Sequence, residues 1–169
     1  HTRFRQIAKY LNPGDVLVIN TSGTLNAALN VTRANGMPVE LHLSTHLPEN
    51  LWVVELRLPG QAGTSPFYEA VEGEILGLPG GARAQLQAPY HPSRPELKSV
   101  TAHQRLWIAR LEIPQPLLTY LAQYGFPIRY KYVRQGWPNS YYQTVFATEM
   151  GSAEMPSAGR AFTPELITQ

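Results

Sequence analysis

Residues 151–163 form the segment whose side chains and spacing are best suited to holding a ligand. The segment reads Gly-Ser-Ala-Glu-Met-Pro-Ser-Ala-Gly-Arg-Ala-Phe-Thr and runs directly into a helix start at Thr163-Pro164-Glu165. Amides at a helix N-terminus can hold a carboxylate or a phosphate. The small residues Ser157, Ala158 and Gly159 allow a ligand to approach the backbone closely. The alternative interpretation is an ordinary tight connection in a compact fold.

A second candidate segment, residues 129–137, interleaves basic and aromatic side chains in the order Arg-Tyr-Lys-Tyr-Val-Arg-Gln-Gly-Trp. Arg129, Lys131 and Arg134 could neutralise phosphates, and a ring such as that of Trp137 could stack on an unpaired base. These four residues are therefore candidates for binding nucleic acid. The pattern alone favours the other interpretation, a strand with apolar residues inward and solvated charges outward.

Motifs for metal, nucleotide or nucleophile chemistry are absent from the sequence. The histidines at positions 1, 42, 46, 91 and 103 form no H-x-x-x-H pair, and His42 falls on the polar face of a predicted strand as a solvated or structural residue. There is no Walker loop, no G-x-G-x-x-G and no G-x-S-x-G, and Gly80-Gly81 fits a hairpin turn. We predict no metal site, and no catalytic residue can be assigned.

The composition is that of a turn-rich globular protein. Its 169 residues include 13 glycines and 15 prolines, and no cysteine is available for a disulfide, a thiolate metal site or a nucleophile. Lys and Arg exceed Asp and Glu by 14 − 12 = +2, which permits an anionic partner without requiring one. No apolar run approaches the ~18 residues of a membrane span, and no signal peptide is recognised, so we expect a cytoplasmic protein that does not enter a membrane.

Hydrophobic periodicity indicates which elements position these segments. Residues 4–11 have the spacing of a short amphipathic helix, and the apolar run 15–20 suits a strand covered on both faces in a parallel sheet. From about residue 28 to 113 the pattern is alternation with Pro-Gly, Gly-Gly and Asn-Gly punctuation, which predicts a small antiparallel barrel or sandwich. The alternating stretches are 39–44, 54–58, 82–88 and 107–113.

Helical spacing returns after the alternating region. A helix is predicted to begin at Pro116 and to stop at Gly125, and another to begin after Thr163. Residues 140–143, Ser-Tyr-Tyr-Gln, read as a capping box in which the serine and glutamine satisfy each other's amides. Together these elements predict an α/β framework interrupted by an all-β insert.

Two stretches of the sequence match one family pattern, one near each end of the chain. The C-terminal stretch reads Tyr142-Gln143-Thr144-Val145-Phe146-Ala147, then Gly151-Ser152-Ala153, Pro156-Ser157-Ala158-Gly159 and Phe162-Thr163-Pro164-Glu165-Leu166. The N-terminal stretch reads Phe4-Arg5 and Leu11-Asn12-Pro13-Gly14-Asp15-Val16-Leu17-Val18-Ile19-Asn20. In these motifs the sequence resembles the S-adenosylmethionine:tRNA ribosyltransferase-isomerase family of queuosine biosynthesis. The family patterns are L-N-P-G-D-L-L-V-F-N and Y-Q-T-V-Y-A…G-S…P-T-A-G-L-H-F-T.

The resemblance implies a two-part fold, an α/β domain interrupted by an inserted antiparallel β-barrel. Residues 1–28 and 114–169 would be parts of the discontinuous α/β domain, and residues 29–113 the inserted barrel. It also implies that the α/β part is incomplete in this chain, which resembles a fragment of the full family sequence.

The resemblance further implies an activity. The family transfers and isomerises the ribosyl part of S-adenosylmethionine onto a deazaguanine base at the tRNA wobble position, which gives epoxyqueuosine. We therefore expect S-adenosylmethionine as a substrate rather than a bound cofactor, and tRNA as the partner. The expected substrate-binding residues are Asn20, Gln143, Pro156, Ser157, Ala158, Gly159, Arg160, Phe162 and Thr163.

The sequence departs from the family pattern at charged positions. Gly23 and Ala28 stand where the family has arginine, and Arg160-Ala161 stands where it has Leu-His. A guanidinium that binds a phosphate or carboxylate contributes roughly 1.5–3 kcal/mol per charge-assisted hydrogen bond. Two alternatives therefore stay open: a divergent non-catalytic paralogue that binds tRNA or a nucleotide, and a ribosyltransferase with another acceptor.

Overall fold

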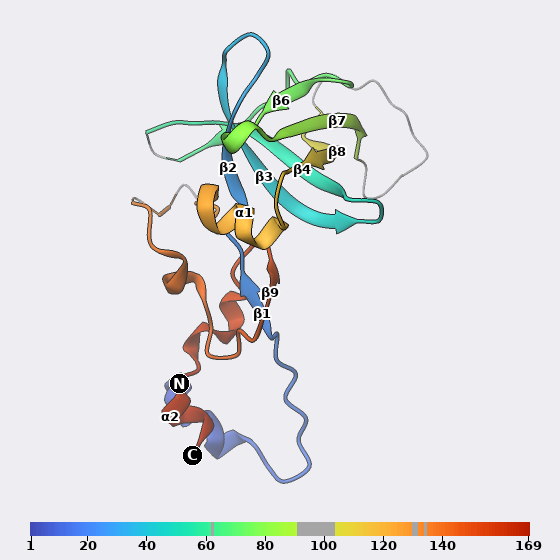
Figure 1. Cartoon of the computed structure of the whole chain (residues 1–169). Helices are drawn as coiled ribbons and strands as arrows, with labels where there is room; N and C mark the ends of the chain where they lie inside the picture. Colours follow the sequence, from blue (N-terminus) through green and yellow to red (C-terminus); the bar gives the residue numbers. More distant parts are fainter. Residues whose placement is uncertain (62, 91–103, 130–131, 134) are drawn as a thin grey trace.

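The computed structural model describes residues 1–61, 63–90, 104–129, 132–133 and 135–169. Its largest part is an antiparallel β-barrel, drawn at the top of Figure 1. The strand order is β3-β2-β6-β7-β8-β4, and β4 pairs back onto β3, so six strands close the barrel. A short strand, β5 (Ser65–Pro66), pairs with the end of β4. The barrel strands are β2 (Ala28–Thr32), β3 (Pro38–Leu47), β4 (Leu51–Leu58), β6 (Ile75–Gly77), β7 (Arg83–Pro89) and β8 (Leu106–Glu112).

The barrel interior is filled by the alternating apolar residues that predicted the strands. Side chains two residues apart in a strand point to the same face, so each strand contributes every second residue to the core. The predicted antiparallel barrel is confirmed. Its buried apolar residues include Leu29, Val31, Val39, Leu41, Leu43, Val54, Leu56, Leu76, Ala84, Leu86, Trp107, Ala109 and Leu111.

The turn between β6 and β7 confirms the predicted Gly-Gly hairpin. Residues Pro79–Gly81 form a single 3₁₀ turn, η2, in which Gly80 and Gly81 have φ of 68° and 77°. These angles lie in the left-handed region, which residues with a Cβ rarely occupy. Glycine at both positions is therefore needed to reverse the chain here.

Helix α1 (Leu117–Tyr124) packs against the barrel and has the predicted ends. Pro116 precedes its first residue, and Gly125 follows its last. Tyr120 and Leu121 are fully buried, and the Tyr120 hydroxyl donates a hydrogen bond of 2.7 Å to the carbonyl oxygen of Pro79. The helix is thereby fixed to the β6–β7 turn by one apolar face and one hydrogen bond.

The buried Tyr120 phenol gives the fold a defined alkaline sensitivity. Burial raises the pKa of Tyr120 from its ordinary value of 10.0 to about 12, and Tyr124 adds to the effect. As the pH rises, the Tyr120 phenol loses its proton in the unfolded chain before it does so in the folded protein. The contribution of Tyr120 to the free energy of unfolding is therefore complete below pH 10 and declines as the pH rises toward about 12. We expect Tyr120→Phe to remove that part of the decline. Urea unfolding of both proteins at about pH 8 and about pH 11.5 tests this, and an equal decline in both would contradict it.

The chain segments before and after the barrel meet below it, with both termini at the far end (Figure 1). Strand β1 (Ser22–Thr24) pairs in parallel with β9 (Glu149–Ser152). The predicted α/β framework is not confirmed, because the described residues outside the barrel form this two-stranded sheet and short helices. Besides α1, these helices are η1 (Phe4–Tyr10), η3 (Asn139–Tyr142), η4 (Ser157–Ala161) and α2 (Pro164–Ile167).

The two terminal helices lie where the sequence predicts them. Helix η1 occupies the predicted position as a 3₁₀ helix, and Phe4 packs edge-on against Phe162 with the ring centroids 4.9 Å apart. Helix α2 begins after Thr163, whose Oγ1 accepts a hydrogen bond from the amide of Leu166. A backbone hydrogen bond and one with the Thr163 side chain lower the pKa of Glu165 in the first turn.

Two local predictions are wrong. The apolar run 15–20 forms no strand and is exposed throughout, with Val18 at 89% exposure, because no strand among the described residues lies beside it to pair with its amides and carbonyls. The capping box at 140–143 does not form, since η3 has Pro138 at its N-cap and no side-chain cap. The amide of Gln143 is instead used by β1, as described below.

Candidate functional site

Helix η4 lies between two hollows, and its residue Ser157 lines both. The first hollow, here called the apolar groove, has a volume of about 520 Å³. One wall is the exposed run that precedes β1, and the other is η4 with two phenylalanines. The groove is lined by Leu17, Val18, Ile19, Asn20, Phe146, Pro156, Ser157, Ala158, Gly159 and Phe162.

The apolar groove brings together six of the nine expected substrate-binding residues, although they come from opposite ends of the chain. Asn20 follows the apolar run, and the other five come from the segment around η4. Their role in binding stays a prediction. The six are Asn20, Pro156, Ser157, Ala158, Gly159 and Phe162.

Close packing holds η4 in this position. A Cβ on Gly159 would lie 3.3 Å from Cγ2 of Thr144 and 3.4 Å from Cδ2 of Phe146, so glycine lets the helix approach these side chains. The ring of Phe162 lies between Phe4 and Phe146, with centroid distances of 4.9 and 5.1 Å. Three segments distant in sequence therefore share one small apolar contact that shapes the groove.

The backbone amides of η4 are largely used inside the protein. The amide of Ser157 donates to the Met155 carbonyl at 2.8 Å, and that of Gly159 donates to the Pro156 carbonyl at 3.0 Å. These two amides are therefore already hydrogen-bonded within the protein, and an anion site at the helix start after Thr163 stays a prediction. The polar side chains of η4 are those of Ser157 and Arg160, and their role in binding stays a prediction.

Gln143 and Thr163 lie outside the apolar groove. The Gln143 side-chain amide pairs with the backbone of Thr24: its Oε1 accepts from the Thr24 amide and its Nε2 donates to the Thr24 carbonyl, both at 2.9 Å. This side chain thus continues the backbone pairing of β1. Thr163 caps α2. The structure gives both residues a positioning role: the cap at Thr163 was predicted from the sequence, whereas the pairing of Gln143 with β1 was not.

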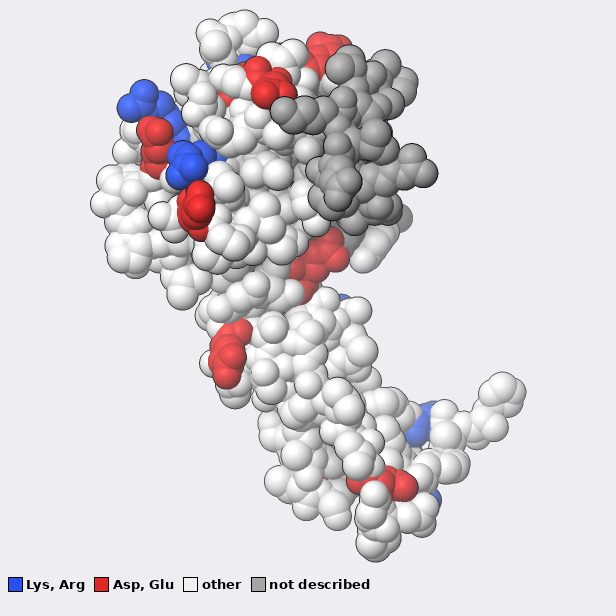
Figure 2. Space-filling view, turned by 90° about the vertical axis from the view of Figure 1, so that its right-hand side faces the viewer, with Lys and Arg blue, Asp and Glu red and all other residues white. Residues whose placement is uncertain are grey.

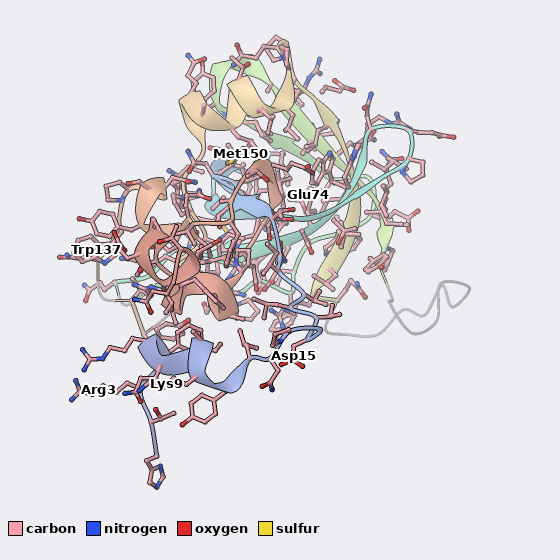
Figure 3. All side chains as sticks on the ribbon, turned by 90° about the horizontal axis from the view of Figure 1, so that it is seen from below. Arg3, Lys9, Asp15, Glu74, Trp137 and Met150 are labelled. Carbon is pink, nitrogen blue, oxygen red and sulfur yellow. The ribbon has the colours of Figure 1, made fainter. Side chains whose placement is uncertain are left out.

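The second hollow, here called the aromatic pocket, has a volume of about 480 Å³ and lies on the other side of η4. Arg160 faces this pocket rather than the groove. The rings of Trp137 and Tyr141 lie 5.0 Å apart with an angle of 35° between their planes. Seen from below in Figure 3, Trp137 lies at the outer edge of the molecule. The pocket is lined by Tyr132, Val133, Trp137, Tyr141, Tyr142, Glu154, Met155, Ser157 and Arg160.

The basic and aromatic segment 129–137 is only partly described. Arg129 and Trp137 share a smaller hollow of about 210 Å³, whereas Lys131 and Arg134 lie outside the described residues. The described positions 129, 132–133 and 135–137 form no strand, so the inward–outward strand interpretation is wrong for them. On the face drawn in Figure 2, the described acidic and basic side chains are interspersed over the barrel.

A charged row on the outer face of β3 and β4 was not expected from the sequence. The Glu55 carboxylate binds two guanidinium groups: Arg57 hydrogen-bonds to it, and Arg105 contacts both of its oxygens at 2.9 and 3.0 Å. This contact raises the pKa of Arg105. Nε2 of His42, in register with Glu55, lies 2.9 Å from the Glu40 carboxylate. His42 is therefore a buried structural residue.

The charged row was hidden because alternation shows only which face a residue occupies. Residues 128–129 and 153–154 lie against this outer face and enclose with it a hollow of about 430 Å³. Two opposite charges spaced i, i+2 on β4 were the available signal. The pattern could not show that other segments cover them.

The two positions where the resembled family has arginine are enclosed in this chain. A Cβ on Gly23 would lie 2.5 Å from Sδ of Met150. Ala28 is fully buried and stands in register with His42. An arginine at position 23 would displace Met150, and one at position 28 would enter the charged row.

The fold defines a class of β-barrel protein in which segments from both sides of the barrel meet outside it. Within that class, the chain belongs to a family described as queuosine biosynthesis protein, whose family model matches residues 1–169.

Curated relatives agree with this family. The chain is 32% identical over 167 residues to a protein of Thermotoga petrophila, 32% over 169 residues to one of Thermus thermophilus, and 29% over 172 residues to one of Nostoc sp.. Each relative is named S-adenosylmethionine:tRNA ribosyltransferase-isomerase, and each match covers 99% of this chain but only 43–44% of the relative. The chain thus spans less than half the length of these relatives. No solved structure matches it. In the described part of the chain, no helix is long and apolar enough to cross a membrane.

Proposed function

We propose that this chain is part of an enzyme that transfers and isomerises the ribosyl moiety of S-adenosylmethionine onto the deazaguanine base at the tRNA wobble position, which gives epoxyqueuosine. The observation that carries the proposal is the apolar groove, in which Asn20 meets the segment Pro156–Phe162 although the barrel separates them in sequence. The names of the relatives support the same reaction. The donor is a substrate that is consumed, its adenine and methionine parts are both released, and tRNA in the cytoplasm is the partner.

The residues around η4 suit the binding of a reactive donor. Small side chains at 157–159 leave room for a ligand beside the helix, and the groove offers it apolar surface. Arg160 supplies a positive charge on the neighbouring side of the same helix turn. We assign these residues to binding and positioning.

We further propose that the segments outside the barrel belong to a discontinuous α/β domain, made of residues 1–28 and 114–169, with residues 29–113 as the inserted barrel. Two observations support this division. The parallel pairing of β1 with β9 joins one segment from each side of the barrel. The apolar run 15–20 forms no strand in this chain but is exposed throughout, so it offers apolar surface that the rest of a longer protein, such as the relatives, can cover.

Adenine release tests the proposed reaction. The full-length protein is incubated with S-adenosylmethionine and tRNA that carries the deazaguanine precursor, and free adenine and modified tRNA are both quantified. We expect adenine and modified tRNA to form in equal amounts, and neither to form with tRNA that lacks the deazaguanine precursor. Adenine release without tRNA modification would identify a ribosyltransferase with another acceptor. No release and no donor binding would overturn the proposal.

A non-catalytic paralogue that binds tRNA or a nucleotide is the second candidate. The enclosed Gly23 and Ala28, which stand at the arginine positions of the resembled family, favour it, because they cannot hold an anion. This candidate predicts binding of tRNA without any adenine release in the same experiment.

A further inference from the structure

The aromatic pocket carries two opposite charges that form no ion pair with any described residue. Glu154 and Arg160 both line it, and Glu154 also borders the hollow over the charged row. They also do not pair with each other. A ligand that carries both a cationic and an anionic group can therefore satisfy both side chains at once.

The rest of the pocket suits a flat ring. The tilted pair formed by Trp137 and Tyr141 presents exposed ring surface, and Trp137 is 42% exposed. Exposed aromatic rings grouped around a hollow are typical of a binding site rather than of a solvated surface. Base–aromatic stacking is a strong and common use of such rings. The volume of about 480 Å³ lies within the range of roughly 300–1,000 Å³ found for small-molecule sites.

We propose that the aromatic pocket binds a nucleoside that carries an α-amino acid group. Its purine stacks on Trp137 and Tyr141, its carboxylate pairs with Arg160, and its ammonium group pairs with Glu154. A sulfonium centre between these two ends is attracted to the aromatic faces as other ligand cations are. A polyanion is a poorer match, because Glu154 repels phosphates at the same rim.

This inference rests on the proposed function, since S-adenosylmethionine is the nucleoside of that chemistry. It assigns the two hollows different roles. The lining of the apolar groove contains no ionisable side chain, so the charged donor lies on the side of Arg160. Ser157 lines both hollows, so it lies between the donor in the aromatic pocket and the apolar groove.

Binding by the full-length protein tests the stacking contact. Three probes are titrated by calorimetry: S-adenosylmethionine, S-adenosylhomocysteine, which lacks the sulfonium charge, and 5′-methylthioadenosine, which lacks the amino acid group. Trp137→Ala is expected to weaken the binding of all three probes by about 5- to 150-fold, the range for the loss of one base–aromatic stack. Tyr10→Ala removes an exposed ring outside the pocket and is the matched control, with binding expected to be unchanged.

The charged contacts are tested with the same probes. Arg160→Gln and Glu154→Gln should each weaken the binding of S-adenosylmethionine and S-adenosylhomocysteine by about tenfold. The binding of 5′-methylthioadenosine should be unaffected. Arg110→Gln, an exposed arginine on β8, is the control and should bind all three probes as the parent does. Thermal unfolding of each variant establishes that it is folded.

The outcomes separate this inference from the proposed function. If adenine is released but the pocket variants bind the probes as the parent does, the pocket assignment is overturned and the function stands. If Trp137→Ala weakens only an anticodon stem-loop RNA, the ring contacts a tRNA base and the assignment is also overturned. If the pocket variants show the expected losses of binding but the parent protein releases no adenine, the pocket assignment stands and the proposed reaction is overturned.

Discussion

Replacing Glu55 with glutamine is expected to lower the free energy of unfolding by about 3–5 kcal/mol, the loss typical of breaking a buried ion pair by removing one partner. Glu55 is 9% exposed, and its carboxylate binds both Arg57 and Arg105. The Arg57 guanidinium is also largely buried and donates from Nε to Oγ1 of Thr64 at 2.5 Å, so it cannot turn to solvent without breaking that contact. Glutamine keeps the shape but leaves this buried charge unneutralised.

Glu112→Gln provides a matched control on the same barrel. Oε2 of Glu112 lies 3.6 Å from Nε of Arg83, and the two side chains are 58% and 64% exposed. Exposed pairs of this kind contribute about 0–1 kcal/mol. Urea unfolding of both variants measures the difference. Similar losses in the two variants would show that the charged row is solvated rather than enclosed.

The barrel could be predicted from the sequence because each strand follows a local rule. In β3, Val39, Leu41 and Leu43 alternate with polar residues, and a period of two residues suffices to assign both the strand and its inward face. Helix α1 could be predicted for a similar reason, since Pro116 and Gly125 mark its ends through their own backbone properties. In both cases the signal lies within ten residues.

The features that could not be predicted depend on segments distant in sequence. The apolar run 15–20 has the composition of a strand, but a strand forms only where a neighbouring strand can pair with its backbone. Composition does not show whether such a neighbour is present. The local sequence predicts that Gln143 caps a helix. Its side-chain amide instead pairs with the backbone of Thr24, which precedes the barrel in the sequence, whereas Gln143 follows it. A side-chain amide can satisfy either partner, and only the fold decides between them.

Six of the nine expected binding residues line one groove, and their role in binding stays a prediction. The motif around Ser157 and Gly159 is visible in the sequence, and the structure places it against Asn20 as one groove. The separation of Arg160 into a different hollow with Trp137 and Tyr141 was not visible. It depends on which way one 3₁₀ turn faces, and that follows from the contacts of Gly159 and Phe162 rather than from spacing.

Replacing Gly125 with alanine is expected to destabilise the protein by about 1–3 kcal/mol, the effect of forcing atoms into a packed site. A Cβ at this position would lie 2.4 Å from the carbonyl oxygen of Asn26 and 2.7 Å from that of Leu121. Both are backbone atoms, so neither can move aside as a flexible side chain can. The backbone of Gly125 has an ordinary φ of −88°, so the requirement for glycine here is one of space.

The same clash threatens the connection between the barrel and the segments that carry the site. Phe126 follows Gly125 directly and exchanges two hydrogen bonds with Ala28, of 2.9 and 3.0 Å, at the start of β2. Gly151→Ala is the matched control, since nothing lies within 4 Å of a Cβ there, and its effect should stay within about 0.5 kcal/mol. Urea unfolding compares the two variants. If Gly125→Ala is as mild as Gly151→Ala, the close approach of α1 to Asn26 is not required by the fold, and the segments beyond α1 are held to the barrel by other contacts.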